Sequence, residues 1–300
     1  MAKTMLKTIL IAVVIVATQF GLSEANDNDR ARYQKINTDS ASVVKSGTFE
    51  VDLGYTYIEQ IGGRNAAFSD SFGNTKQSKS NTRSHQAMLA VTYGLMDKMD
   101  LTARIGWADF KDKDYPYADS HGNGITDLEI ETKYLFYQDD NNGVKLAYVA
   151  GISVPIGSES RTLHLNVGKN YWALLQRLVL TKDLDKQWNM SADVGYRLPF
   201  GRHRDAYSPE FGRRMTDTRG TLESNVALGY TGIDFLQPIV ETNYAHEWLG
   251  SANDSDLLGF TVGAVVPIDK HYLRVGVQRD FWGRNAIRSY TLSAGLTLAF

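Results

Sequence analysis

One pair of residues in this sequence could support nucleophilic hydrolysis, which needs a serine hydroxyl beside a histidine that takes its proton. Ser224 and His246 lie on the same face of two neighbouring predicted strands. A turn that pairs Tyr230 with Leu236 would set the register between these strands. Ser224 then lies opposite Thr242, and His246 falls further along, roughly 13 Å away at about 3.3 Å per residue. This register excludes the dyad, so we predict no catalytic residue and do not expect an enzyme.

Metal and cofactor chemistry also lack the residues that they need. The chain contains no cysteine, which excludes thiolate metal sites, a thiol nucleophile and disulfides. No glycine-rich loop follows a strand and opens a helix, so nucleotide binding has no support. The remaining histidines show no close pair with metal-ligand spacing. They are His85, His121, His164, His203 and His271. We expect neither a cofactor nor a metal.

Charged residues occupy the polar face of many predicted strands, and two interpretations of them stay open. If the strands close into a narrow barrel, opposite charges can pair across its lumen and restrict the water in it, which would make these residues structural. Alternatively, the mixed lining filters a small solute, and an excess of carboxylates on the fourth, eighth and ninth strands would favour cations. The candidate lumen-lining residues are Glu50, Asp52, Arg104, Glu129, Glu131, Lys133, Lys145, Asp193, Arg197, Glu223, Glu241 and Arg274.

Apolar and polar residues alternate along the strands that must position these charges. In the first predicted strand, 48–57, aromatic and aliphatic residues occupy the odd positions, and charged or small residues occupy the even ones. Period-two alternation is typical of β-strands with two unlike faces. One segment is irregular, because Leu175 and Val179 fall on the face opposite Leu174 and Leu178. The pattern predicts an all-β fold, a closed antiparallel transmembrane β-barrel of about 12 strands.

The connections between these strands alternate in length along the chain. Short turns such as 96–98 and 139–143 alternate with longer loops such as 59–82 and 199–219. Short periplasmic turns opposite longer extracellular loops are typical of outer-membrane barrels. The last strand, Tyr290 to Phe300, would pair with the first to close the barrel. It also resembles the insertion signal that the barrel assembly machinery reads, so that machinery and outer-membrane lipids are expected partners.

The start of the sequence predicts export. Two lysines precede an apolar core at 9–16, and Ser23-Glu24-Ala25 is a small-x-small cleavage site, so 1–25 is a predicted signal peptide. The polar stretch 26–46 is either a periplasmic N-terminal tail or a plug segment, and 47–300 is the predicted barrel. A net charge of −2 argues against nucleic acid as a partner. We expect the protein in the outer membrane of a Gram-negative bacterium.

Short motifs in the middle of the sequence point to a family. They are Gly124-Ile125-Thr126-Asp127-Leu128, Val154-Pro155-Ile156-Gly157, Leu180-Thr181-Lys182-Asp183-Leu184 and Gly195-Tyr196-Arg197. In these motifs the chain resembles a family of outer-membrane transporters labelled as belonging to the meta-pathway of phenol degradation. The resemblance implies passive uptake of small aromatic or hydrophobic compounds, although the family commonly has Thr at the position of Ile156.

The predicted function is an outer-membrane channel or passive transporter for a small solute. Two alternatives stay open. An outer-membrane lipid hydrolase would show esterase activity that one serine or histidine substitution removes. A structural or adhesive barrel would bind an external partner through the loops 59–82 and 199–219.

Overall fold

The chain forms a closed barrel of twelve antiparallel strands. Its computed structural model describes residues 32–61, 65–69, 75–115, 120–158, 167–168, 171–200, 207–208, 213–214, 218–249, 254–286 and 288–300. The predicted signal peptide, 1–25, lies outside the described residues. Within those residues, no helix is long and apolar enough to cross a bilayer. The predicted fold class is confirmed.

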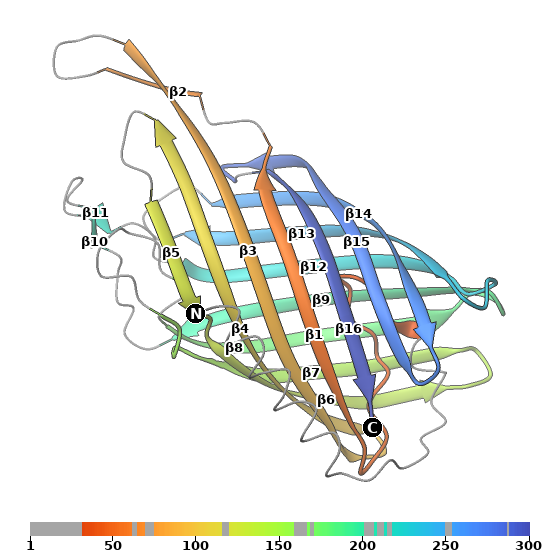
Figure 1. Cartoon of the computed structure of the whole chain (residues 1–300). Helices are drawn as coiled ribbons and strands as arrows, with labels where there is room; N and C mark the ends of the chain where they lie inside the picture. The colour runs from red at the N-terminus through yellow and green to blue at the C-terminus, as the bar shows by residue number, and fades with distance from the viewer. Residues whose placement is uncertain are drawn as a thin grey trace.

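Each barrel strand pairs with its neighbours around a complete circle. Around the barrel the strands are β1 (Phe49–Gln60), β3 (Thr75–Met96), β4 (Met99–Tyr115), β6 (Leu128–Asp139), β7 (Val144–Val154), β8 (Trp172–Asp183), β9 (Trp188–Phe200), β12 (Thr218–Tyr230), β13 (Gln237–Leu249), β14 (Ser255–Ile268), β15 (His271–Arg284) and β16 (Ser289–Ala299). The hairpin of β2 (Asn65–Ser69) with the start of β3 extends beyond the barrel (Figure 1). β5 (Ser120–Ile125) pairs with β4, on the same edge of β4 that pairs with β6. A separate small ribbon joins β10 (Tyr207–Ser208) to β11 (Arg213–Arg214).

The seam of the barrel joins β16 to β1, as the sequence predicts. Phe49 and Phe300 exchange backbone hydrogen bonds of 3.2 and 2.9 Å. Their rings stack with centroids 4.9 Å apart. Closing the sheet in this way leaves no unpaired edge at the first or last strand.

The outward faces of the strands form an apolar belt. Leu178, Val262 and Leu292 are each about half exposed, at 50%, 53% and 47%. Contiguous apolar surface of this kind on a soluble protein would promote association. In a bilayer, lipid chains cover such a belt.

A segment that is not part of the sheet lies inside the barrel. We call residues 32–46 the strap. We call the end of the barrel with the short connections the turn end, and the end with the long connections the loop end. Arg32 Nη2 lies 3.2 Å from Asp183 Oδ1, where β8 turns into β9. Gly47 donates a hydrogen bond of 2.9 Å to the Gly94 carbonyl near the turn from β3 to β4. The strap therefore enters and leaves the lumen at the turn end (Figure 1).

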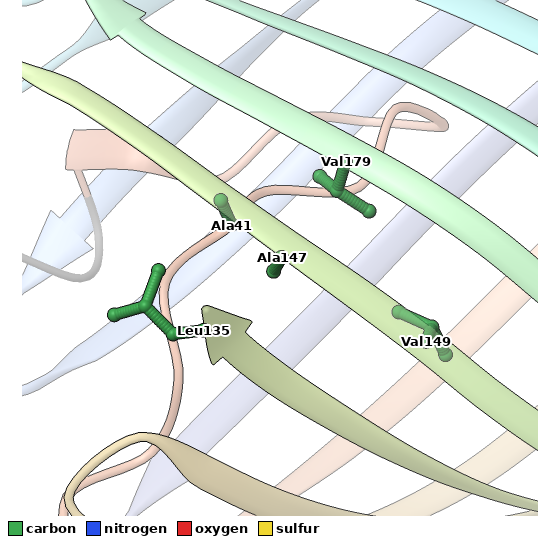
Figure 2. Packing of buried hydrophobic residues seen from close by; sticks show 5 residues of the cluster. All are labelled: Ala41, Leu135, Ala147, Val149 and Val179. Carbon is green, nitrogen blue, oxygen red and sulfur yellow. The ribbon is translucent and has the colours of Figure 1, made fainter. Parts of the chain in front are cut away.

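Two apolar clusters pack the strap against two sides of the barrel wall near the turn end. Ala41 of the strap lies among Leu135, Ala147, Val149 and Val179 from β6, β7 and β8 (Figure 2). Val179 and Ala147 have no exposed surface. This cluster explains the irregular face of the segment around Val179, because the strap covers an inward side chain that would otherwise meet water.

The second cluster lies on the opposite wall. Ile36 of the strap packs against Ile239, Val265 and Tyr272 from β13, β14 and β15. Gly276 on β15 makes room for it, since a Cβ there would lie 2.7 Å from the Ile36 side chain. The part of the lumen near the turn end, which we call the lower lumen, is thus a packed core with the strap at its centre.

Candidate functional site

Carboxylates of the barrel wall accept hydrogen bonds from the strap backbone. Glu241 on β13, which is 1% exposed, accepts from the N–H groups of Ile36 at 2.6 Å and Asn37 at 2.9 Å. Asp193 on β9 accepts from the N–H of Asp39 at 2.8 Å. Hydrogen bonds to a charged acceptor are about twice as strong as neutral ones. Two predicted lumen residues, Glu241 and Asp193, therefore bind the strap.

An ion-pair cluster surrounds Asp39 at mid-lumen. Lys133 Nζ lies 2.7 Å from Asp39 Oδ1, and Arg177 Nη1 lies 3.5 Å from Asp39 Oδ2. Burial raises the pKa of Asp39, but Lys133 and Arg177 outweigh it, so the pKa lies well below its ordinary value. Burial lowers the pKa of Lys35 to about 8. Lys35 Nζ donates a 2.6 Å hydrogen bond to Asn189 Oδ1.

Further contacts fix both ends of the strap. The Tyr33 hydroxyl donates to Asp183 Oδ2 at 2.9 Å, and Lys145 Nζ lies 4.6 Å from the centre of the Tyr33 ring. The N–H of Val44 donates to Asp100 Oδ2 at 3.1 Å. Lys133 and Lys145, two more predicted lumen residues, thus contact the strap rather than an open channel.

Gly94 allows the strap to lie directly on β3. A Cβ at this position would overlap the carbonyl oxygen of Lys45 and lie 2.7 Å from that of Val44. Gly94→Ala is expected to release this end of the strap, with trypsin cleavage after Lys45 roughly tenfold faster, since overpacking typically costs 1–3 kcal/mol. The control is Gly54→Ala, whose Cβ would make ordinary contacts at 3.5 Å. Equal cleavage of the two variants would contradict this account.

A cavity of about 430 Å³ lies between the strap and the loop end of the barrel. Strap residues 34 and 36–39 form its floor. Its charged wall residues are Asp52, Arg104, Glu129, Glu131, Arg177, Arg197, Glu223 and Arg274. All of these except Arg177 are predicted lumen-lining residues. Glu50 is buried nearer the turn end, beside a smaller cavity of about 130 Å³.

Arginines pair with the carboxylates of this cavity. Arg197 Nη2 lies 2.6 Å from Glu129 Oε1, and Arg104 Nη1 lies 3.2 Å from Glu129 Oε2. The same Arg104 nitrogen lies 3.6 Å from Glu131 Oε2. Two cations therefore hold the two carboxylates of β6, which reduces the cation preference that the sequence alone suggests.

The remaining two arginines complete the lining. Arg274 on β15 pairs with Asp52 on β1. Arg177 Nη2 lies 3.6 Å from Glu223 Oε2 on β12. Arg177 contacts both the strap and the cavity, and sequence reasoning missed it. Its place two residues from both Leu175 and Val179, on the inward face, is the signal that could have found it.

The predicted register between Ser224 and His246 is wrong. Pairing of β12 with β13 sets Ser224 opposite Tyr244 and Leu222 opposite His246. The hairpin begins to pair at Gly229, so the connection is wider than a turn that pairs Tyr230 with Leu236. Ser224 and His246 are therefore diagonal neighbours on the outward face, with Cα atoms about 7–8 Å apart.

His246 takes part in a polar cluster at the loop end of that face. Its Nδ1 lies 2.7 Å from Asp256 Oδ1, and its ring packs edge-on against Trp248. Asp256 also accepts hydrogen bonds from the Tyr244 hydroxyl at 2.7 Å and from Arg284 Nε at 2.6 Å. Among the described residues, no group of three or more His, Cys, Asp or Glu side chains could hold a metal ion.

Two of the short sequence motifs meet in one junction. Asp127 Oδ1 accepts a 3.0 Å hydrogen bond from the N–H of Gly157. Ser158 donates its N–H to the Ile125 carbonyl at 2.8 Å, and its Oγ accepts the N–H of Ile125 at 3.0 Å. These contacts join the start of β6 to the segment that follows β7, where Pro155 offers no N–H donor.

Asp127→Ala is expected to loosen this junction without opening the barrel. Losing the acceptor leaves the Gly157 N–H unpaired, at a cost of about 1–3 kcal/mol. Amide hydrogen exchange at Gly157 and Ser158 should be faster, while exchange in β13 should not change. Asp127→Asn keeps a side-chain oxygen and is the matched control. Slow exchange at Gly157 in both variants would show that Asp127 does not support the junction.

Comparison with known proteins places this geometry in a family. Residues 108–296 match the family described as "Putative MetA-pathway of phenol degradation". Among solved structures, the chain is similar to the COG4313 outer membrane channel from Pseudomonas putida F1, with 16% identity and a TM-score of 0.67, covering 89% of this chain and 100% of that chain. It is also similar to the beta domain of the Bordetella autotransporter BrkA, with 12% identity and a TM-score of 0.51, covering 84% and 99%. No curated protein matches it by sequence.

Proposed function

The chain belongs to the MetA-pathway of phenol degradation family, and we propose that it is a passive outer-membrane channel for small solutes. The observation that supports this proposal is the cavity of about 430 Å³ enclosed by a barrel with an apolar outer belt. Ligand cavities typically have volumes of about 300–1,000 Å³. A small solute therefore fits in this cavity of the lumen. In the expected orientation the turn end faces the periplasm, and the loop end faces the cell exterior.

In this proposal the strap is a plug on the periplasmic side. It enters and leaves at the turn end, and its polar and apolar contacts fill the lower lumen. A solute that reaches the cavity from the loop end meets the strap as the floor. Passage into the periplasm requires the strap to move.

Small aromatic or hydrophobic compounds are the solute class that the family description suggests. The cavity has apolar wall residues for the body of such a compound, Met88, Val149 and Leu175. Outer-membrane lipids would cover the apolar belt. The barrel assembly machinery would read the last strand, Tyr290 to Phe300.

Planar-bilayer recording of the refolded protein tests the channel. We expect discrete current steps in potassium chloride, because a water-filled path opens whenever the strap leaves the wall. Folding is checked first by heat-modifiable migration on a gel. A folded barrel that passes no current, with or without the strap, would refute the channel and favour the hydrolase or the adhesive barrel.

A further inference from the structure

The outward face of the hairpin formed by β3 and β4 carries a column of cations at the loop end. Arg83 on β3 lies directly opposite Lys111 on β4 in the register of the two strands. Both side chains are more than half exposed, at 55% and 59%. By the alternation of the same register, Lys113 and Lys79 occupy positions further out on this face. We call Lys79, Arg83, Lys111 and Lys113 the basic column.

Aromatic rings mark the level at which the basic column begins. Trp107 lies on the outward face of β4, four residues before Lys111. The centroid of the Tyr57 ring lies 4.9 Å from that of the His85 ring, on the neighbouring strands β1 and β3. Trp and Tyr rings gather at the boundary between hydrocarbon and headgroups. Four residues of strand span roughly 13 Å, or roughly 9 Å of height at a tilt of about 45°. The basic column therefore lies beyond the hydrocarbon, among the headgroups of the leaflet around the loop end.

The charges of this hairpin are sorted between its two faces. Asp112 and Asp114 alternate with the lysines of β4, so they occupy the opposite face. On the outward face beyond the rings, the described residues of β1 to β5 include two carboxylates, Glu59 and Asp109. These two carboxylates lie beside the four cations of the basic column. The outward face of the hairpin is therefore positively charged.

The two carboxylates leave the cations available to a further anion. Arg83 Nη2 lies 2.8 Å from Glu59 Oε1, and Lys111 Nζ lies 3.7 Å from Asp109 Oδ2. Exposed ion pairs of this kind contribute little to stability. Asp109 Oδ1 also lies 2.6 Å from His121 Nε2. Like charges directly opposite each other on paired strands are destabilising, so an anion between Arg83 and Lys111 would remove a repulsion.

We propose that the basic column binds the phosphates of lipid A, the phosphorylated glycolipid of the outer leaflet. The phosphates accept charge-assisted hydrogen bonds from Arg83 and Lys111, and arginine in particular suits phosphate because it can donate two parallel N–H groups. The acyl chains lie below the rings, against the apolar belt of β3 and β4. Anionic headgroups attract a cluster of cations at this height, which a zwitterionic headgroup does not. The inference goes beyond the channel and rests on its expected orientation, with the loop end at the cell exterior.

Native mass spectrometry of the full mature chain in neutral detergent, titrated with diphosphoryl lipid A, tests the proposal. We expect saturable binding that is several-fold tighter than that of monophosphoryl lipid A with the same acyl chains. Arg83→Gln and Lys111→Gln should each weaken binding about fivefold, the loss expected of one cation at an anionic surface.

Two variants are matched controls for the loss of one positive charge. Lys98→Gln removes an exposed lysine at the turn end of the same hairpin. Arg279→Gln removes an arginine from the outward face of β15, where Arg279 lies 5.5 Å from the centre of the Tyr290 ring. Neither should weaken binding as the two column variants do. Heat-modifiable migration confirms that each variant is folded.

Three results would overturn the assignment. One is equal affinity for lipid A in the column variants and the two controls. The others are binding of monophosphoryl lipid A as tight as that of diphosphoryl lipid A, and displacement by phosphatidylglycerol at the same concentration as by lipid A itself. Current in potassium chloride through a barrel that does not bind lipid A would refute this inference and leave the channel intact. Saturable binding of lipid A to a barrel that passes no current would refute the channel and leave the lipid site intact.

Discussion

Removal of residues 32–46 is expected to raise the single-channel conductance of the refolded barrel several-fold. The strap occupies the lower lumen, where Glu241, Asp193 and Asp100 hold its backbone. Without it, water and ions replace a packed core, and the cavity is continuous with the turn end. Planar-bilayer recording of the full and shortened chains in the same lipid gives the comparison.

A reversible disulfide tests the same step without deleting any residue. Ala41→Cys and Val179→Cys place two thiols in one packed cluster, and the chain has no other cysteine. The oxidised double variant should pass little current, and a reducing agent should restore the current of the unmodified chain. Each single-cysteine variant is a control for the substitution itself. Oxidised and reduced channels with equal conductance would show that the strap does not close the lumen.

Arg177→Met is expected to destabilise the barrel more than any other single substitution in the lumen. Arg177 is within ion-pair distance of Asp39, Asp193 and Glu223. The Asp193 side chain is fully buried, so loss of its cation leaves an uncompensated charge. Removing one partner of a buried pair costs about 3–5 kcal/mol. Urea unfolding of the barrel from lipid vesicles measures this loss.

A second substitution distinguishes charge from packing. Adding Asp193→Asn to Arg177→Met should recover part of the lost stability, because the amide removes the unpaired charge. The difference between the double variant and the two single variants gives the coupling energy. Arg279→Met, on the outward face, is the matched control. If Arg177→Met unfolds at the same urea concentration as that control, the ion-pair cluster does not stabilise the barrel.

The outward half of this barrel could be predicted from the sequence, and the reason is its period-two pattern. Every second residue of β1 from Phe49 to Tyr57 is apolar, the pattern expected of a barrel strand whose whole outer face is to meet lipid. Closure through Phe300 follows from the same pattern. Both predictions depend only on local residue order.

The inward face of the barrel packs against the strap, whose sequence has no periodic pattern. Val179 and Leu175 look irregular in sequence, because nothing nearby shows that the strap covers one and the cavity receives the other. Asp39 contacts Lys133 and Asp193, which lie far along the chain. The predicted register of β12 with β13 was wrong for a related reason, since the length of a hairpin loop depends on its three-dimensional contacts.

The covalent link at Gly47 determines how long the lumen can stay open. Gly47 adopts a φ of 79° and joins the strap directly to β1. A strap that leaves the wall therefore remains a tethered ligand, with an effective concentration on the order of millimolar for a short flexible linker. Reclosure is unimolecular and independent of protein concentration. A free peptide with the sequence of residues 32–46 would have to reach a comparable concentration to compete for the same wall.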